Sequence, residues 1–278
     1  MKKFKVALQL YSVRDFMEKD MDATLKAVAD MGYEYVEFAG YFDKTAEEVR
    51  AMLDKYGLTA ISVHQSYFPI LEDPEYWTKY LTTLGVKFCA MPWMDVKKHK
   101  GTDEFENTVA EFKKVGKILK DAGIQFLYHN HDFEFETVDG KYKLDWLYES
   151  VPADLLETQI DTCWVRYAGE DPAAYVRKYT GRTQIVHLKD FTCKAFNAGA
   201  AYALIDKDGK EMKKATREEN GFCFQPLGMG IQDFKSILEA AEDAGADYVV
   251  VEQDQSIGRT SLEAVEISRK FLKDNFDI

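Results

Sequence analysis

Acidic, imidazole and amide side chains follow several short runs of apolar residues in this chain. They are Gln9, Glu37, His64, His129 with His131, Glu157 with Gln159 and Asp161, His187 with Lys189, and Glu252 with Asp254. Apolar runs of this length are typical of parallel strands covered on both faces, which should be apolar throughout. Burying an unpaired carboxylate is costly unless a cation or hydrogen bonds offset the loss of water. These positions therefore indicate a catalytic or metal-binding site.

Carboxylate oxygens and imidazole nitrogens that converge at one place suit Mn²⁺, Mg²⁺, Co²⁺ or Zn²⁺ better than metals that select thiolates. Because side chains alternate along a strand, Glu157, Gln159 and Asp161 lie on one face of their strand. His187 and Lys189 likewise share one face of the next strand, and we expect these polar faces to form the barrel interior. A lone strand histidine is more often a hydrogen-bonded core residue than a metal ligand, and Asp161 alone could cap a helix. The combination, rather than any single residue, predicts the metal site.

Eight alternations of strand-like and helical segments must position these side chains. The expected strands are Lys5–Leu10, Tyr35–Phe38, Thr59–Val63, Phe88–Met91, Gln125–Asn130, Glu157–Ile160, Gln184–Leu188 and Asp247–Glu252. The expected helices are Met21–Met31, Ala46–Lys55, Glu75–Thr83, Glu104–Ala122, Asp145–Ser150, Pro172–Lys178, Gln232–Ala244 and Ser261–Asn275. Eight such units in one chain predict an α/β fold, a single-domain (β/α)₈ TIM barrel over residues 1–278, with its active site at the carboxyl ends of the strands.

The alternative to a barrel is an open, doubly wound sheet. That fold usually carries a Gly-rich loop after its first strand, and the corresponding segment here, Tyr11–Asp15, has no glycine. One irregular stretch, about residues 191–229, is much longer than an ordinary connection, and such loops are usually functional lids or disordered segments. Phosphate binding is not supported, because Gly228-Met229-Gly230 is the one weak candidate for a phosphate loop.

Composition excludes several classes of function. The chain has 36 Lys and Arg against 48 Asp and Glu, a net charge of −12, which disfavours a nucleic-acid partner. No apolar run is long enough for a membrane span. The four cysteines form no Cys-x-x-Cys pair, and the first residues carry no apolar signal segment, so we expect a cytoplasmic protein with free thiols. A homo-oligomer remains open.

Five segments resemble the xylose-isomerase-like barrel superfamily, and more narrowly its sugar phosphate isomerase/epimerase branch. They are Leu8–Arg14, Tyr128–Phe135, Gln159–Thr162, His187–Asp190 and Val251–Asp254. The branch includes ketose 3-epimerases, inosose dehydratase and keto-glycoside lyases. The resemblance implies a (β/α)₈ barrel holding one divalent metal ion, most often Mn²⁺, through Glu, Asp, His and Glu from the last four strands, with a small carbohydrate as the substrate.

Carried over by position, the resemblance implies Asp161, His187 and Glu252 as three of the metal ligands. At the first ligand position, where many members read Glu-Asn-His, this chain has His129, so either imidazole replaces carboxylate there or Glu134 or a water completes the shell. His131 falls where lyase-like members place a general base. Only Glu252 remains of the two glutamates that epimerases use to exchange a proton, which gives weight to one-base isomerisation or β-elimination.

The expected reaction is proton abstraction next to the carbonyl of a keto sugar or related polyol, through an enediolate. His131 or Glu252 would move the proton, and Lys189 would stabilise the oxyanion or act as an acid. The other reading of Lys189 is a salt bridge with Glu157. Residues expected to contact the substrate are Gln9, Glu37, His64, Trp93 and Glu157.

This activity is that of an isomerase or epimerase. The alternatives are a dehydratase or lyase of a 3-keto sugar, keto-glycoside or keto-inositol, an endonuclease IV-like nuclease, and a non-catalytic binding barrel. A nuclease of that kind would need more ligands and a basic rim.

Overall fold

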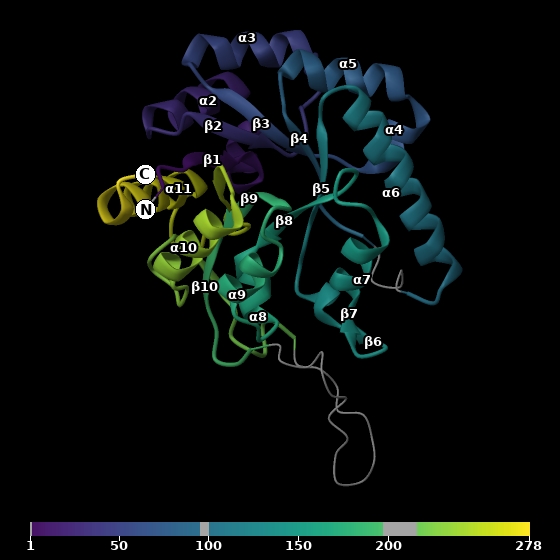
Figure 1. The fold of residues 1–278 in the computed structure, drawn as a ribbon. Helices are drawn as coiled ribbons and strands as arrows, with labels where there is room; N and C mark the ends of the chain where they lie inside the picture. Colours follow the sequence, from purple (N-terminus) through teal and green to yellow (C-terminus); the bar gives the residue numbers. More distant parts are fainter. Residues whose placement is uncertain (1, 95–99, 197–215) are drawn as a thin grey trace.

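A closed barrel of eight parallel strands forms the centre of the molecule (Figure 1). The computed structural model describes residues 2–94, 100–196 and 216–278. The barrel strands are β1 (Lys5–Gln9), β2 (Tyr35–Phe38), β3 (Thr59–His64), β4 (Phe88–Met91), β5 (Gln125–His129), β8 (Glu157–Asp161), β9 (Thr183–Leu188) and β12 (Tyr248–Val251). They follow one another around the barrel in chain order, and β12 closes on β1. The predicted fold class is confirmed, with every predicted strand in place.

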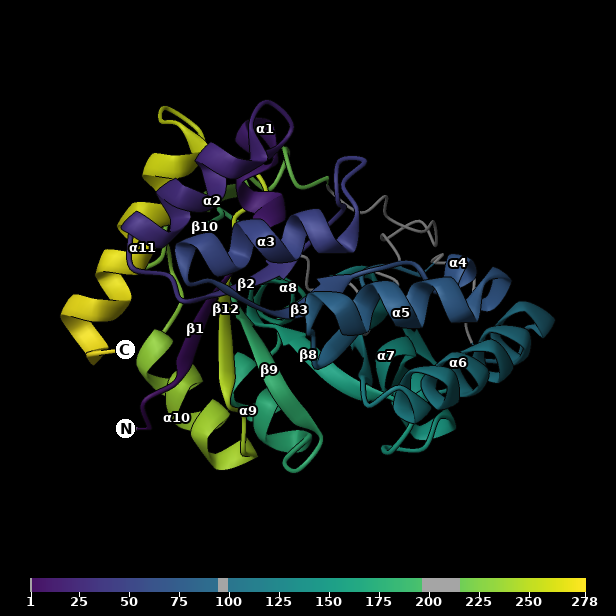
Figure 2. The same ribbon diagram turned by 90° about the horizontal axis from the view of Figure 1, so that it is seen from above.

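Helices cover the outside of the barrel (Figures 1 and 2). They are α1 (Arg14–Met17), α2 (Met21–Asp30), α3 (Ala46–Tyr56), α4 (Tyr67–Glu72), α5 (Pro74–Leu84), α6 (Asp103–Asp121), α7 (Lys143–Ser150), α8 (Thr162–Tyr167), α9 (Pro172–Lys178), α10 (Phe234–Ala244) and α11 (Ser261–Phe276). The eight predicted helices agree to within two residues at each end. Three short helices, α1, α4 and α8, have no counterpart in the prediction because each is a turn or two long and has too few residues to show a period.

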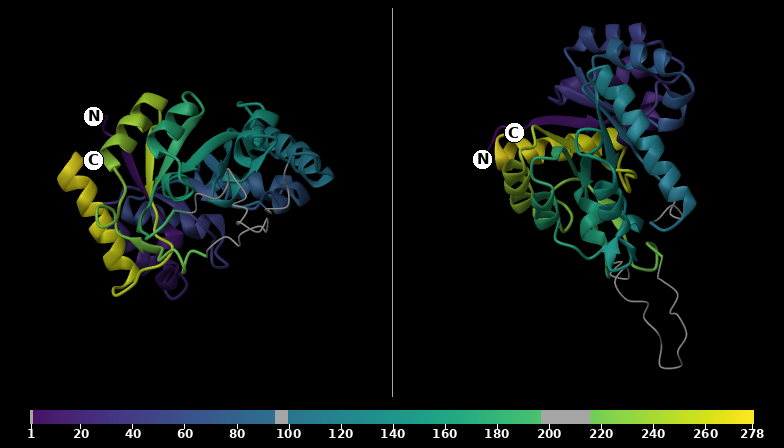
Figure 3. Two further views of the ribbon diagram at one scale, coloured as in Figure 1. Left: turned by 90° about the horizontal axis from the view of Figure 1, so that it is seen from below. Right: turned by 45° about the vertical axis from the view of Figure 1, so that its right-hand side comes forward.

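The helix ends follow local chemistry. Thr45 and Glu48 form a reciprocal capping box at the start of α3, and Gly57, at φ 69°, ends that helix in the left-handed conformation. The two chain ends lie side by side in every view (Figure 3), where Lys3 Nζ is 3.6 Å from Asp277 Oδ2.

Two small antiparallel pairs of strands lie outside the barrel. One joins β6 (Thr137–Val138) to β7 (Lys141–Tyr142), and the other joins β10 (Asp190–Thr192) to β11 (Cys223–Gln225). The second pair brackets the long segment predicted as a loop at about 191–229, so both ends of that segment are ordered as strands. The middle of the predicted loop, residues 197–215, lies outside the described residues.

The side chains inside the barrel change from apolar to polar along the barrel axis. Near the amino ends of the strands, a buried apolar cluster fills the interior with Ala7, Ile61, Phe88, Ala90, Leu127, Ile185, Tyr248 and Val250. Closer to the carboxyl ends, the inward positions become polar, with Gln9 beside Glu37 and Asp161 beside His187 in register. Val186 and Leu188 belong to the larger core between the strands and helices, as alternation predicts. The apolar layer thus closes one end of the barrel and leaves the polar layer facing the mouth.

Gly116 lets α6 pack closely against the segment before β8. A Cβ atom added at this position would lie 2.2 Å from the carbonyl oxygen of Leu155. In an exposed helix, Gly→Ala stabilises by about 1 kcal/mol. Here we expect Gly116→Ala to lower the free energy of unfolding by about 1–3 kcal/mol, measured by urea denaturation.

The matched control is Asn107→Ala on the exposed side of the same helix. Its effect should stay within about 0.5 kcal/mol. A Gly116→Ala protein as stable as the wild type would show that the close approach does not exist.

Candidate active site

Four potential metal ligands come together at the mouth of the barrel. His129 and Asp161 end β5 and β8, His187 lies in β9, and Glu252 follows β12. These four strands are consecutive in the barrel, and one donor atom from each side chain lies within 4.8 Å of the others. All four residues are buried. We call them the quartet, and they are the four residues that the family resemblance implies as metal ligands.

Hydrogen bonds to the backbone of Asp161 and Glu252 hold two residues of the quartet in place. The Asn130 side chain accepts a hydrogen bond from the Asp161 N–H at 2.9 Å, which ties the end of β5 to the end of β8. The Glu252 N–H donates to the Leu188 carbonyl at 3.1 Å, which holds Glu252 against β9. The side chains are therefore held in place by the barrel itself.

Asp161 has two roles, one for each oxygen. Oδ1 accepts hydrogen bonds from the N–H groups of Cys163 and Trp164, and so caps α8. Oδ2 is buried and faces the Lys189 ammonium, with Nζ at 3.0 Å. The capping reading and the ligand reading of Asp161 are thus compatible, because the cap aims the second oxygen into the quartet.

The spacing of the donor atoms fits a divalent ion. Nε2 of His129 lies 3.6 Å from Asp161 Oδ2 and 4.0 Å from Glu252 Oε2, and Nδ1 of His187 lies 3.0 Å from the same Glu252 oxygen. Bonds of about 2.0–2.2 Å to a shared ion place neighbouring ligand atoms about 3–4 Å apart. The quartet could therefore hold a metal ion of the oxygen- and imidazole-binding class.

His187 lies between two carboxylates. Its Nε2 is 2.8 Å from Glu37 Oε1, and its Nδ1 faces Glu252. Burial lowers the pKa of His187, but the two carboxylates outweigh burial and raise it to about 10. A carboxylate that faces the remote nitrogen of a histidine fixes the ring and leaves the other nitrogen free to bind a metal. Glu37 is placed to do this for Nδ1.

Glu37 is fully buried and held by several side chains. Gln9 Nε2 donates to Oε1 at 2.8 Å, Gln159 Nε2 donates to Oε2 at 2.6 Å, and His64 Nε2 is 3.1 Å from Oε1. Burial would raise the pKa of Glu37, but His64 and His187 hold it well below its usual range. Gln9 and Glu37 are enclosed in this network and are not among the residues that line the cavity, and their contact with a substrate stays a prediction.

Lys189 lies at the centre of the acidic groups. Its Nζ is 3.0 Å from Asp161 Oδ2, from Glu252 Oε2 and from Asp254 Oδ1. Burial lowers the pKa of Lys189, yet these carboxylates raise it well above its usual value, so the side chain is an ammonium ion. Lys189 is therefore placed next to the donor atoms of the quartet. Its ion-pair partners are Asp161, Glu252 and Asp254 rather than Glu157.

The structure does not bring Glu157 to the mouth. It is the first residue of β8 and pairs in register with Leu127 of the apolar layer. Alternation along the strand correctly places Glu157 on the face of Gln159 and Asp161, but it does not give the height in the barrel. Glu157 is not among the residues that line the cavity at the mouth, and its contact with a substrate stays a prediction.

A cavity of about 540 Å³ opens above the quartet. Its wall contains the predicted residues His64, Trp93, His129, His131, Lys189 and Glu252. Trp93 is half exposed, so its ring is free to contact a ligand. Burial, followed by the charge of Lys189, lowers the pKa of His131 to about 3, so His131 is a neutral imidazole. Proton-transfer groups and potential metal ligands therefore share one cavity.

Glu134 does not belong to the quartet. Its carboxylate accepts hydrogen bonds from the Tyr128 hydroxyl at 2.6 Å and from the His131 N–H at 2.8 Å. It fixes the backbone that carries His131. The alternative in which Glu134 replaces His129 as a ligand is not favoured by this arrangement.

Other cavity residues gave no periodic signal in the sequence. They are Tyr11, Arg14, Phe224, Arg217 and Gln255. Arg217 stacks on Trp164, with its guanidinium carbon 4.1 Å from the ring centroid, and pairs with Asp132 at 2.6 Å. Arg217 falls within the long segment that its length marked as functional, but nothing in that segment singles it out.

The loop Gly228-Met229-Gly230 is occupied by a carboxylate of the chain itself. Asp190 accepts hydrogen bonds from the N–H groups of Gly228, Gly230 and Gln232 at 2.9–3.2 Å. A Cβ at Gly230 would lie 2.1 Å from Asp190 Oδ1, which requires glycine at this position. The N–H groups of this loop therefore serve the Asp190 carboxylate.

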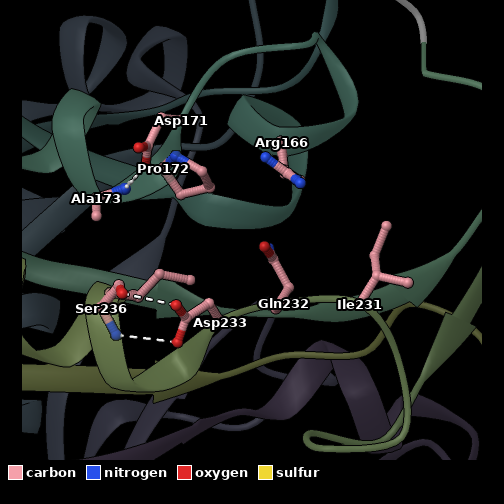
Figure 4. A pocket seen from close by; sticks show the side chains of 9 residues that line it. Arg166, Asp171, Pro172, Ala173, Ile231, Gln232, Asp233 and Ser236 are labelled. Atoms are coloured by element: carbon pink, nitrogen blue, oxygen red, sulfur yellow. Dashed lines mark hydrogen bonds between the residues drawn. The ribbon is translucent and has the colours of Figure 1, made fainter.

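A second cavity, of about 220 Å³, lies away from the quartet between the α8–α9 region and α10 (Figure 4). Two of its acidic side chains cap helices: Asp171 accepts from the Ala173 N–H, and Asp233 accepts from Ser236. Both acidic side chains of this cavity are thus engaged in holding helix ends.

A family model described as xylose isomerase-like TIM barrel matches residues 25–275. The chain belongs to this family. Among curated relatives, inosose dehydratase from Geobacillus kaustophilus is 28% identical over 61% of this chain and 61% of its own length. The match therefore spans less than two thirds of that relative. Inosose dehydratase from Clostridium beijerinckii is 23% identical over 92% of this chain and 90% of its own.

Solved structures of this family share the fold. A sugar phosphate isomerase/epimerase from Parabacteroides distasonis superposes with a TM-score of 0.76 at 23% identity, covering 99% of this chain and 96% of its own. The IOLI protein, solved with a zinc atom, gives a TM-score of 0.69 at 14% identity and covers 97% of each chain. Among residues 2–94, 100–196 and 216–278, no helix combines the length and apolar character needed to cross a bilayer.

The contact between Glu37 and His187 leads to a prediction about metal affinity. Glu37→Gln removes the charge that faces Nε2 of His187 and leaves the ring orientation less defined. We expect the affinity for Mn²⁺, measured by isothermal titration, to fall about 10–100-fold. Glu157→Gln, which changes a glutamate outside the cavity, should leave it unchanged. Equal Mn²⁺ affinities for Glu37→Gln and the wild type would show that Glu37 does not influence metal binding.

Glu134 leads to a prediction about pH. Burial raises its pKa from 4.5 to about 8, although the hydrogen bonds from Tyr128 and His131 oppose the rise. An acid whose pKa is raised by folding contributes fully to stability when the pH is below its pKa in the unfolded chain. That contribution is lost as the pH rises from the pKa of the unfolded chain to the pKa of the folded protein. The stability of the wild type relative to Glu134→Gln should therefore fall between about pH 5 and pH 8, by at most about 1.4 kcal/mol per unit.

Urea denaturation of both proteins across this range measures the difference. A difference that does not vary with pH would mean that Glu134 has an ordinary pKa.

Proposed function

We propose that this chain is a divalent-metal-dependent enzyme that removes a proton next to the carbonyl of a keto sugar or related polyol. The observation that carries the proposal is the quartet of potential ligands, two of which, His129 and Glu252, line one cavity together with Lys189 and His131. The inosose dehydratase relatives add support for a carbohydrate or polyol substrate. The family relationship supports a small-molecule substrate, with Mn²⁺ as the first metal to test and Zn²⁺, Co²⁺ and Mg²⁺ as the others.

The quartet would hold the ion, and a bound ion would supply Lewis-acid polarisation of the carbonyl oxygen, which would acidify the neighbouring C–H. His131 takes the proton from this carbon. It is neutral, it lines the cavity, and its Nδ1 makes no hydrogen bond among the described residues. Glu252 also reaches the cavity wall and is the second group that could accept the proton. Trp93 offers an exposed ring face to the sugar.

β-Elimination is the outcome that we favour after proton removal. His129 stands where a two-base exchange would need a second carboxylate, and the buried Lys189 ammonium can donate a proton to a departing hydroxyl group. The leaving hydroxyl takes the Lys189 proton and departs as water, while His131 keeps the proton removed from carbon. The activity would then be that of a dehydratase or lyase.

Isomerisation or epimerisation is the second candidate. It is favoured by the presence of both His131 and Glu252 on the cavity wall, since two groups could remove and return a proton. The two outcomes share the first step and differ in whether water is lost.

Deuterium exchange in D₂O tests the shared step. With Mn²⁺ and a panel of keto-inositols, 3-keto sugars and ketohexoses, we expect exchange of the C–H next to the carbonyl, followed by mass spectrometry for loss of water. His131→Asn should slow exchange about 10²–10⁴-fold at unchanged metal content. Glu252→Gln should lower both exchange and metal content, and Glu157→Gln should alter neither.

Two results would contradict the proposal. One is full activity in Glu252→Gln. The other is sugar binding by the metal-loaded wild type without any C–H exchange across the panel, which would indicate a binding protein.

A further inference from the structure

Lys189 and a divalent ion require the same oxygen atoms. Nζ of Lys189 is 3.0 Å from Asp161 Oδ2 and 3.0 Å from Glu252 Oε2, and both oxygens are the donor atoms of the quartet. An ion bound to these oxygens would lie close to the ammonium group. Because two positive charges at such a distance in a protein interior repel strongly, the ammonium cannot keep all its contacts when the ion is bound.

The surroundings of Lys189 leave one favourable direction for its displacement. The rings of Trp164 and Phe224 lie near Nζ, with centroids at 5.2 and 5.8 Å. Asp161 is fully buried on the quartet side. Asp254 is the third partner, at 3.0 Å, and its side chain is 25% exposed and lines the cavity. Of the three carboxylate partners of the ammonium, Asp254 is thus the one that lies outside the quartet, and it lines the cavity.

Asp254 is itself held in place. Nη2 of Arg14 donates to the Asp254 carbonyl at 2.9 Å, and Arg14 also binds the Tyr11 carbonyl. The carboxylate of Asp254 lies outside the four donor side chains of the quartet. It thus remains available to the ammonium when the other two carboxylates bind an ion.

We propose that Lys189 and the divalent ion compete for Asp161 and Glu252, and that Asp254 is a positioning residue that receives the Lys189 ammonium when the ion binds. Without the ion, the ammonium is the counter-charge of the quartet. With the ion, the ammonium pairs with Asp254 at the cavity wall, where it meets the substrate. This inference rests on the metal centre of the proposed function and adds to it a role for Asp254.

A double-mutant cycle in metal affinity tests the competition. The Mn²⁺ affinities of the wild type, Lys189→Met, Asp254→Asn and the double variant are measured by isothermal titration, with bound Mn²⁺ counted by electron paramagnetic resonance. We expect Lys189→Met to bind about tenfold more tightly, since the competing charge is gone. Asp254→Asn should bind about tenfold more weakly, because the ammonium then has no partner other than the quartet.

The sign of the coupling decides the role of Asp254. In the Lys189→Met background, Asp254→Asn should change the affinity by no more than about twofold, because no ammonium needs a partner. Asp254→Glu, which keeps the carboxylate, should bind Mn²⁺ like the wild type. An equal loss from Asp254→Asn in both backgrounds, or a Lys189→Met protein that binds no more tightly than the wild type, would overturn the proposal.

The same data separate this inference from the proposed function. If neither the wild type nor Lys189→Met binds Mn²⁺, both the metal centre and the competition are wrong. If the cycle behaves as expected but no keto sugar exchanges deuterium, the competition stands and the proposed reaction fails. Circular dichroism and thermal unfolding of each variant confirm that the fold is retained.

Discussion

The barrel mouth must neutralise several carboxylates that are withdrawn from water. Glu37, Asp161 and Glu252 are buried within a few side chains of one another, with the partly exposed Asp254 beside them, and burial of these carboxylates would be prohibitive without an opposing charge or donor. His187 and Lys189 provide part of that charge, and a divalent ion would provide more. The positions of the surrounding polar groups follow from this single electrostatic requirement.

The fold meets the requirement by dividing the barrel interior into layers. The apolar layer around Leu127 and Tyr248 closes one end and excludes water there. The next layer contains Glu37 with its amide and imidazole partners, and the quartet lies above it. Each layer orients the one above it, so that His187 reaches the quartet with a defined ring orientation. The cavity then gives a substrate access to groups that the protein has already fixed.

Much of this arrangement could be predicted from the sequence, because strand alternation and apolar runs are local signals. They located the eight strands and placed His129, Asp161, His187 and Glu252 at one mouth. Other features depend on distances between segments that are remote in the chain. The height of Glu157, the enclosure of Glu37 by side chains from four other strands, and the arrival of Arg217 at the cavity have no local signature. The sequence indicated which polar residues belong to the site. The tertiary packing determined which of them position other residues of the site.

The account rests on a divalent ion bound by the quartet, and crystallography with anomalous scattering tests this most directly. Crystals grown with Mn²⁺ should give one anomalous difference peak at the barrel mouth, about 2.0–2.3 Å from donor atoms of His129, Asp161, His187 and Glu252, with the Lys189 ammonium on Asp254. A peak that lacks His129 as a ligand would correct the ligand set. The absence of any peak at the mouth, with Lys189 still in contact with Asp161 and Glu252 at saturating Mn²⁺, would contradict the account.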